Sequence, residues 1–227
     1  MAGSAPDLIG PDLTAEDLAC RRGGRLVFAG LSFRLPAGGA LVLTGANGAG
    51  KTSLLRLAAG LMAPAAGRLA WGAAPIAADP AEHRARLHYV GHQDAVKPAL
   101  TPRETLTFGA ALRGLEVRRS GPVIEQALAA FALDAVAEWP CRWLSAGQRR
   151  RLALARLLVA PALIWLLDEP MSALDADNQA RLEQVIAAHR AAGGRLLVAT
   201  HAPIGLNAAT DLALDAFAPL SADLELG

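Results

Sequence analysis

The sequence is poor in lysine, cysteine and aromatic residues. Its two lysines are Lys51 and Lys97, and aromatic residues make up 4% of the 227 positions. The two cysteines, Cys20 and Cys141, lie far apart and lack the spacing of a metal site. We therefore expect reduced structural thiols, as is usual in the cytosol. Lysine and arginine total 22 against 21 acidic residues, so no excess of positive charge indicates nucleic-acid binding.

The chain also lacks a long hydrophobic run. The longest, residues 157–167, has 11 residues, whereas a membrane-spanning helix needs about 20. We therefore expect no transmembrane helix, so that any work at a membrane requires a partner protein. The first residues contain no basic segment ahead of an apolar run. We expect no signal peptide there, and a loose tail over residues 1–12.

What the sequence does contain is a candidate phosphate-binding loop, GANGAGKT, which fits the template G-x-x-x-x-G-K-[ST]. Its residues are Gly45, Ala46, Asn47, Gly48, Ala49, Gly50, Lys51 and Thr52. It follows an apolar run at 40–44, expected to be a strand, and precedes an expected helix at 53–59. In that context the loop amides bind phosphate, Lys51 reaches the β- and γ-phosphates, and Thr52 holds Mg²⁺. The alternative is a glycine-rich turn before an ordinary helix.

Two acids follow a second apolar segment. Asp168 and Glu169 come directly after residues 162–167, which we expect to form a strand buried on both faces. Ligands of parallel α/β sheets bind at this end of the strands. Asp168 is therefore a candidate Mg²⁺ ligand, and Glu169 a candidate base for the attacking water. A further expected strand, 195–200, ends at His201, which is placed to contact the γ-phosphate. The alternatives are acids that cap the next helix and a histidine without a functional role.

A second candidate anion site begins at Ser145. Ser145 stands in the N-cap position of an expected helix whose first turn carries three arginines, 149–151. A simple capped helix is one interpretation, and a phosphate site formed by the Ser145 hydroxyl and the Gly147 amide is the other. Arginine in a first turn opposes the helix dipole. A nearby polyphosphate or acidic partner would relieve that conflict.

Taken in order, these motifs resemble those of the ATP-binding subunits of ABC transporters. The strings GANGAGKT, LSAGQ, LIWLLDEP, SALD and ATH lie within a resemblance that runs from about residue 13 to about residue 212. The resemblance implies an α/β fold in which a P-loop NTPase core carries an antiparallel β-layer and a helical lobe. It also implies an ATP hydrolase that uses ATP and Mg²⁺, in which two chains, head to tail, bury two ATP molecules between them.

The resemblance assigns a role to each matching residue. The loop from Gly45 to Thr52 corresponds to Walker A, and Asp168 to the Walker B acid. Glu169, Gln93 and His201 would be catalytic, and Thr52, Asp168 and Gln93 would hold the metal. Ser145, Ala146, Gly147 and Gln148 correspond to the signature, and Asp175 to the acid of the D-loop. The signature of one chain would close over the ATP held by the other.

Two positions depart from the family pattern. Ala146 stands where the signature usually has glycine, and its methyl group could slow closure over the γ-phosphate. The hairpin at 20–25 contains no aromatic residue to stack on adenine. Arg22 falls about where that ring would lie, and a guanidinium can stack on a flat π-face. A solvated basic turn is the equal alternative.

Residues 13–227 are expected to form a single domain. Short alternating segments at 13–37 and 67–90 indicate an antiparallel β-layer. Helical spacing dominates between about 94 and 143, with helices expected at 102–112 and 122–133 that have proline at or near the start. This region would be the helical lobe. A further amphipathic helix is expected at 176–192, ended by two glycines.

Within the ABC family, the sequence resembles the ATP-binding subunits that serve cytochrome c maturation and are described as haem exporters. The string GHQ around Gln93, the following Leu100-Thr101-x-x-Glu104-x-Leu106, FAGLSF and LSAGQRRRLALARL carry this resemblance. It implies an integral membrane subunit as partner, on the cytoplasmic face of the bacterial inner membrane. Alternatives are the ATPase of another small exporter, or a soluble ABC ATPase of iron–sulfur cluster assembly. We expect His92 to be a loop histidine rather than a haem ligand.

Overall fold

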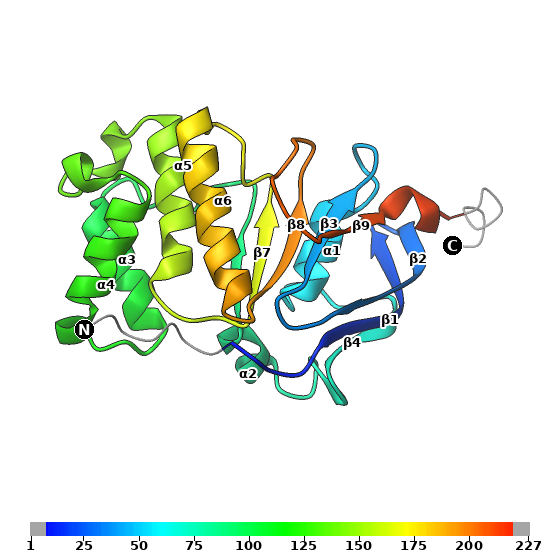
Figure 1. The fold of residues 1–227 in the computed structure, drawn as a ribbon. Helices are drawn as coiled ribbons and strands as arrows, with labels where there is room; N and C mark the ends of the chain where they lie inside the picture. Colours follow the sequence, from blue (N-terminus) through cyan, green and yellow to red (C-terminus); the bar gives the residue numbers. More distant parts are fainter. Residues whose placement is uncertain (1–7, 220–227) are drawn as a thin grey trace.

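The apolar segments at the centre of the chain form a parallel sheet. The computed structural model describes residues 8–219, except for the side chains of 117–119. In spatial order the strands are β6 (Leu87–Val90), β7 (Ile164–Asp168), β8 (Arg195–Ala199), β3 (Ala40–Thr44) and β9 (Thr210–Ala213) (Figure 1). All neighbours pair in parallel. The strands expected at 40–44, 162–167 and 195–200 are thus confirmed to within two residues.

A second sheet is antiparallel and lies beside the first. Its order is β2 (Arg25–Leu35), β1 (Leu13–Arg22), β4 (Ala66–Trp71) and β5 (Ala74–Pro75). The antiparallel layer expected from 13–37 and from the first part of 67–90 is confirmed. The second part of 67–90 was predicted wrongly, because Pro80–Ala85 form helix α2 and β6 pairs with β7 in the parallel sheet. Three of the four β6 residues are buried, as suits a strand covered on both faces.

Helices flank the parallel sheet. Those of eight or more residues within 8–219 are α1 (Lys51–Ala58), α3 (Pro102–Leu112), α4 (Val117–Ala130), α5 (Ala146–Ala155) and α6 (Ala176–Ala191). Helix α3 has the predicted bounds, and α6 ends one residue before the predicted end. Short 3-10 turns are η1 (Asp134–Val136), η2 (Cys141–Trp143), η3 (Arg156–Leu158) and η4 (Leu214–Phe217).

Helix α4 begins five residues earlier than its proline suggested. Pro122 lies inside the helix, although proline in a helix interior removes a hydrogen bond and usually marks a boundary. The buried positions Ser120, Ile124, Ala127 and Leu128 continue across Pro122 at helical spacing. Burial of this stripe therefore outweighs the local cost of the proline.

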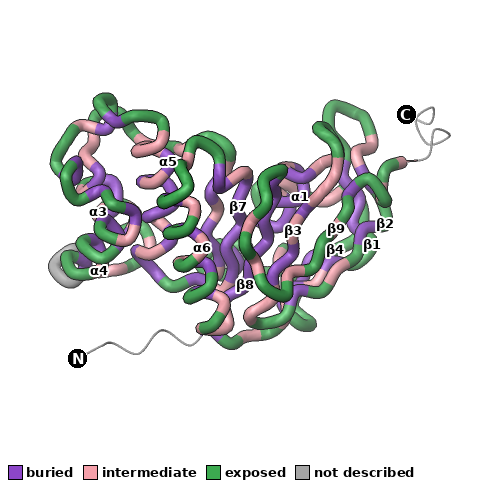
Figure 2. The backbone as a smooth tube through the Cα atoms, turned by 45° about the horizontal axis from the view of Figure 1, so that its top comes forward, coloured by how far each residue is buried: buried purple, intermediate pink, exposed green. Residues whose placement is uncertain are grey.

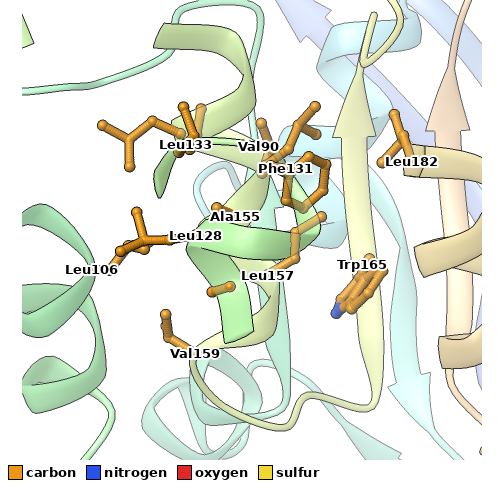
Figure 3. Packing of buried hydrophobic residues seen from close by; sticks show 14 of the residues in the cluster. Val90, Leu106, Leu128, Phe131, Leu133, Ala155, Leu157, Val159, Trp165 and Leu182 are labelled. Carbon is orange, nitrogen blue, oxygen red and sulfur yellow. The ribbon is translucent and has the colours of Figure 1, made fainter. Parts of the chain in front are cut away.

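The two faces of the parallel sheet belong to different hydrophobic clusters. Along β7, Trp165 and Leu167 pack with the helices, whereas Ile164 and Leu166 pack with α1 and the antiparallel sheet. This alternation follows from the twofold repeat of a strand. Figure 2 shows that β7 and β8 are among the buried parts of the chain. Figure 3 shows Phe131 of the helical region and Leu182 of α6 among the side chains of the cluster that contains Trp165.

The segment before β1 is fixed to the core. Arg195 has no exposed surface and donates to the carbonyl oxygens of Leu8 (3.4 Å), Gly10 (2.5 Å) and Pro11 (3.0 Å). The Leu8 N–H donates to the Ala192 carbonyl. A loose tail over residues 1–12 is therefore wrong for residues 8–12, because a buried arginine needs these carbonyls as acceptors. Residues 1–7 lie outside the described part of the chain.

The expectations from the cysteines and from the short apolar runs agree with the structure. Cys20 and Cys141 are buried and free, and burial raises the pKa of both thiols. Such thiols are chemically inert. Between residues 8 and 219, no helix is both long and apolar enough to cross a membrane. The boundary of a separate helical lobe at 94–143 stays a prediction.

Candidate active site

The loop between β3 and α1 leaves the start of the helix available to an anion. Gly50 is the N-cap of α1 with φ of 104°, and no side chain caps the helix. A Cβ at Gly50 would lie 2.8 Å from a methyl of Val27 and 2.9 Å from the ring of Phe28. Glycine is therefore required here for backbone conformation and for space. The uncapped N–H groups and the helix dipole favour a negatively charged ligand.

Lys51 is folded back across this loop. Its Nζ donates to the carbonyl oxygens of Gly45 (2.6 Å) and Ala46 (3.1 Å), and the residue is 9% exposed. The loop is held from the other side by Asp215 of η4, whose carboxylate accepts from the Ala46 N–H at 3.1 and 3.3 Å. These contacts set the position of the ammonium group before any phosphate is bound.

A hydroxyl and a carboxylate meet at the carboxyl end of β7. Thr52 Oγ1 donates to Asp168 Oδ2 at 2.9 Å, and Asp168 is 4% exposed. Oxygen ligands of this kind suit a small hard cation such as Mg²⁺. The donor set of Thr52 and Asp168 therefore fits the metal that the sequence predicted there.

Glu169 has a backbone conformation that is rare for a residue with a side chain. Its φ is 47°, and its N–H donates to the Ala199 carbonyl at 2.8 Å. The carboxylate accepts from the His201 N–H at 3.3 Å, and its other oxygen lies 3.8 Å from His201 Nε2. The backbone thus turns the Glu169 side chain toward the end of β8, where His201 lies. Left-handed geometry of this kind is common at functional sites.

A cavity of about 410 Å³ brings part of the phosphate loop together with Asp168, Glu169 and His201. It is lined by Asn47, Gly48, Gly50, Lys51, Thr52, Ser53, His92, Asp168, Glu169 and His201. Gln93 instead lines an adjoining groove of about 620 Å³, which shares Thr52, His92 and Asp168 with the cavity. His92, expected to be a loop histidine, therefore borders both spaces.

The predicted signature lies outside these linings. Ser145 caps α5 through a capping box: its hydroxyl accepts from the Gln148 N–H at 3.2 Å, and its N–H donates to the Gln148 side chain at 2.8 Å. A Cβ at Gly147 would lie 3.0 Å from the Ala173 carbonyl, so the start of α5 packs closely against the segment that contains Ala173. Asp175 caps α6, and hydrogen bonds from Asn178 lower the pKa of its carboxyl.

Comparisons with known proteins agree on one family. A family model described as "ABC transporter" matches residues 28–172. A "Cytochrome c biogenesis ATP-binding export protein CcmA" from Rhodospirillum rubrum is 58% identical over 90% of this chain and 86% of its own. A protein of the same name from Paramagnetospirillum magneticum is 55% identical over 90% of this chain and 94% of its own. The chain belongs to the CcmA branch of the ABC transporter family.

The fold of this family is also found in solved structures. A putative ABC transporter ATP-binding protein from Pyrococcus furiosus superposes with a TM-score of 0.80, at 21% identity, over 92% of this chain and all of the other. This likeness supports the fold alone. The α/β fold with parallel and antiparallel sheets and flanking helices, expected for an ABC ATPase, is thereby confirmed.

Arg22 remains a prediction in this CcmA-type chain. It is exposed at the end of β1, opposite Arg25 of β2, and is not among the residues that line the cavity. Both alternatives, stacking on adenine and a solvated basic turn, stay open on the geometry of this hairpin.

The contacts of the three arginines that follow the signature were not predicted from the sequence. Arg149 donates to the Leu144 carbonyl, Arg151 donates to the carbonyls of Phe131 and Ala132, and Arg150 is buried among further acceptors. The chain's own backbone carbonyls therefore accept hydrogen bonds from all three arginines. Helix α5 begins at Ala146, three residues before Arg149, so the arginines lie beyond the first three positions of the helix. The burial of Arg150, though not its contacts, could have been predicted, because Arg150 stands four residues before the buried Leu154 on one helix face. Asp215 gave no comparable signal, since it contacts Ala46 only through the tertiary fold.

Proposed function

We propose that this chain is the ATP-binding and ATP-hydrolysing subunit of an ABC transporter that serves c-type cytochrome biogenesis. Hydrolysis would drive haem-related transport or the release of a haem-carrying chaperone. The observation that carries the ATPase activity is the cavity shared by the phosphate loop, Asp168, Glu169 and His201. The relatives of 58% and 55% identity support the assignment to cytochrome c biogenesis. These relatives do not support the two alternatives, the ATPase of another small exporter and an ATPase of iron–sulfur cluster assembly.

ATP and Mg²⁺ are proposed to occupy this cavity. Lys51 and the amides at the start of α1 bind the phosphates, while Thr52, Asp168 and Gln93 hold the cation. Bound Mg²⁺ neutralises charge on the phosphates. Glu169 orients and deprotonates the attacking water, and His201 lies beside it to contact the γ-phosphate. Arg22 is proposed to stack on adenine.

A second copy of the chain is proposed to complete the site. Ser145, Ala146, Gly147, Gln148 and Asp175 would then face the ATP held by the other copy. The supporting observation is that none of these residues is among those that line the cavity of their own chain. The start of α5 also offers helix N–H groups to an anion.

A membrane subunit is proposed to bind the helical region and the loop that carries Gln93, at the cytoplasmic face of the bacterial inner membrane. Helix α3 presents Phe108 and Leu112 to solvent, with 49% and 71% of each residue exposed. Exposed apolar side chains suit contact with another protein, and Phe108 lies against Lys97, four residues after Gln93. No nucleic-acid partner is proposed.

The test is covalent haem attachment in cells that lack their own copy of this subunit. Strains carry the wild-type chain, Glu169→Gln, or Glu82→Gln, which makes the same change at an exposed ion pair of α2. Glu169→Gln should remain membrane-bound but abolish haem staining of periplasmic c-type cytochromes, while b-type cytochromes and haem synthesis persist. Glu82→Gln should stain normally. Normal staining with Glu169→Gln would contradict the role in cytochrome biogenesis. The proposal that the chain hydrolyses ATP would still stand.

A further inference from the structure

Arg150 is a buried cation that binds two separate segments of the site. It is 2% exposed and lies in the second turn of α5. Its Nη2 donates to the carbonyls of Asp168 at 2.8 Å and Glu169 at 2.7 Å, and its Nε lies 3.4 Å from the Pro170 carbonyl. On this side, Arg150 holds the peptide groups that carry both acids of the site.

The other side of the guanidinium holds the loop around Gln93. Nη1 donates to the Gly91 carbonyl at 2.9 Å and to Asp94 Oδ1 at 3.2 Å. The two residues flank the dipeptide of His92 and Gln93, which border the groove. Because a guanidinium is planar and rigid, its nitrogens cannot move independently. A displacement of the Gln93 loop is therefore passed to the backbone of Asp168 and Glu169.

Glu169 is the residue that this contact can most easily disturb. A non-glycine residue in the left-handed region persists only when its surroundings fix it. The Glu169 carbonyl accepts from Arg150 and from Ser172, and its N–H is held by Ala199. Loss of the Arg150 contact would leave the Glu169 carbonyl with Ser172 as its remaining donor and relax the turn that aims the carboxylate toward His201.

We infer that Arg150 is a positioning residue that couples the Gln93 loop to the orientation of Glu169, so that the hydrolytic step depends on where that loop lies. The inference rests on the proposed ATP hydrolysis by Glu169. Arg150 itself touches neither substrate nor reacting atoms. Its effect should therefore appear in kcat and not in the affinity for ATP.

The experiment is a double-mutant cycle with Arg150→Lys and Asp94→Ala, measured by steady-state ATP hydrolysis and nucleotide binding. A lysine keeps the charge but cannot reach both segments at once. Arg150→Lys should lower kcat by about 10- to 100-fold, the size of effect produced by slight misplacement of a reacting group. The KM and Kd for ATP should stay within about threefold, and Asp94→Ala alone should lower kcat by about 3- to 10-fold. In the Arg150→Lys background, Asp94→Ala should add less than about twofold, because coupled residues are not additive.

The matched control is Arg195→Lys. Arg195 is likewise buried and donates to three backbone carbonyls, but at the opposite end of the parallel sheet. It should lower the melting temperature with kcat and KM unchanged. Independent, multiplying effects of Arg150→Lys and Asp94→Ala, or a rise in KM at constant kcat, would overturn the coupling. If Arg150→Lys does not fold, an unchanged kcat in Asp94→Ala overturns it. A wild-type chain that hydrolyses no ATP would instead refute the proposed function.

Discussion

The two predicted halves of the nucleotide site differ in how complete they are within one chain. In the phosphate-loop half, Lys51, the Thr52–Asp168 pair and the Glu169–His201 pair surround one cavity. In the signature half, Ser145 is satisfied by its own capping box with Gln148. The phosphate-loop half forms a cavity that can hold a ligand, whereas the signature half forms the capped start of a helix.

This difference indicates which steps one chain can perform alone. The ammonium and amide groups that we propose to bind nucleotide lie in the phosphate-loop half. In the proposed dimer, the signature half would act on a phosphate held by another copy. The two halves of one chain are nevertheless linked, because Arg150 of the signature helix bonds to the carbonyls of Asp168 and Glu169.

The largest expected effect is on nucleotide binding in the phosphate-loop half. Lys51→Ala removes the buried ammonium next to the Gly45 and Ala46 carbonyls. We expect the Kd for ATP to rise by about 100-fold or more, as loss of a charged hydrogen-bonding group worth about 3 kcal/mol predicts. Isothermal titration calorimetry measures this directly. Lys97→Ala, the change at the other lysine, should leave the Kd unchanged; equal losses in both variants would contradict the site.

The next effect separates hydrolysis from binding within the same half. Glu169→Gln keeps the size of the side chain but removes the base, so we expect phosphate release to fall by about 10²- to 10⁴-fold. Binding of ATP should stay within about twofold of wild type, because the ligands of the phosphates are retained. Single-turnover hydrolysis and nucleotide titration check the two expectations. Retained hydrolysis would remove Glu169 from its proposed role.

Two matched capping boxes test whether the signature half does more than end a helix. Ser145→Ala and Thr101→Ala each remove one such box, at α5 and α3 respectively. Both should lower the free energy of unfolding by about 1 kcal/mol. Only Ser145→Ala should also reduce ATP-dependent dimerisation, measured by light scattering in the Glu169→Gln background with ATP and Mg²⁺. ADP is the negative control, and an unchanged dimer in Ser145→Ala would reduce Ser145 to a structural cap.

The smallest expected effect concerns the methyl group of Ala146. Ala146→Gly restores the usual family residue at the start of α5, and should cost less than about 1 kcal/mol of stability. If the methyl slows closure by a few tenths of a kcal/mol, kcat should rise by less than about threefold. Ala180→Gly, on the exposed face of α6, should cost similar stability without raising kcat. A fall in kcat with Ala146→Gly would show that the methyl assists closure.

Local patterns predicted the strands and the helix of the phosphate-loop half. The loop and the strand before it are encoded within a few residues, because strand, glycine turn and helix start follow one another directly. The two acids are likewise local, at the last residue of β7 and the residue after it. The bounds of α3 are likewise local, set by the capping box of Thr101 and Glu104 and by Pro102. Such features can be read from sequence because their hydrogen bonds connect near neighbours.

The features that escaped prediction depend on distant contacts. Pro122 is accepted inside α4 because its helix face is buried, and residues 8–12 are fixed because Arg195 binds their carbonyls. Arg150 pairs with acceptors 18 to 59 residues away. No local window contains both partners of such contacts, so spacing and composition alone could not reveal them.

The burial of Lys51 also means that the two lysine side chains should differ in their reactivity toward amine-reactive reagents. Of its two lysine side chains, Lys51 is 9% exposed, whereas Lys97 is exposed and lies 5.1 Å from the centre of the Phe108 ring. Of the two lysine side chains, an acylating dye should therefore modify Lys97 and spare Lys51 of the phosphate loop. Because Lys97 stands close to the Gln93 loop in sequence, a fluorophore there would report movements of the helical region without a mutation having to be introduced.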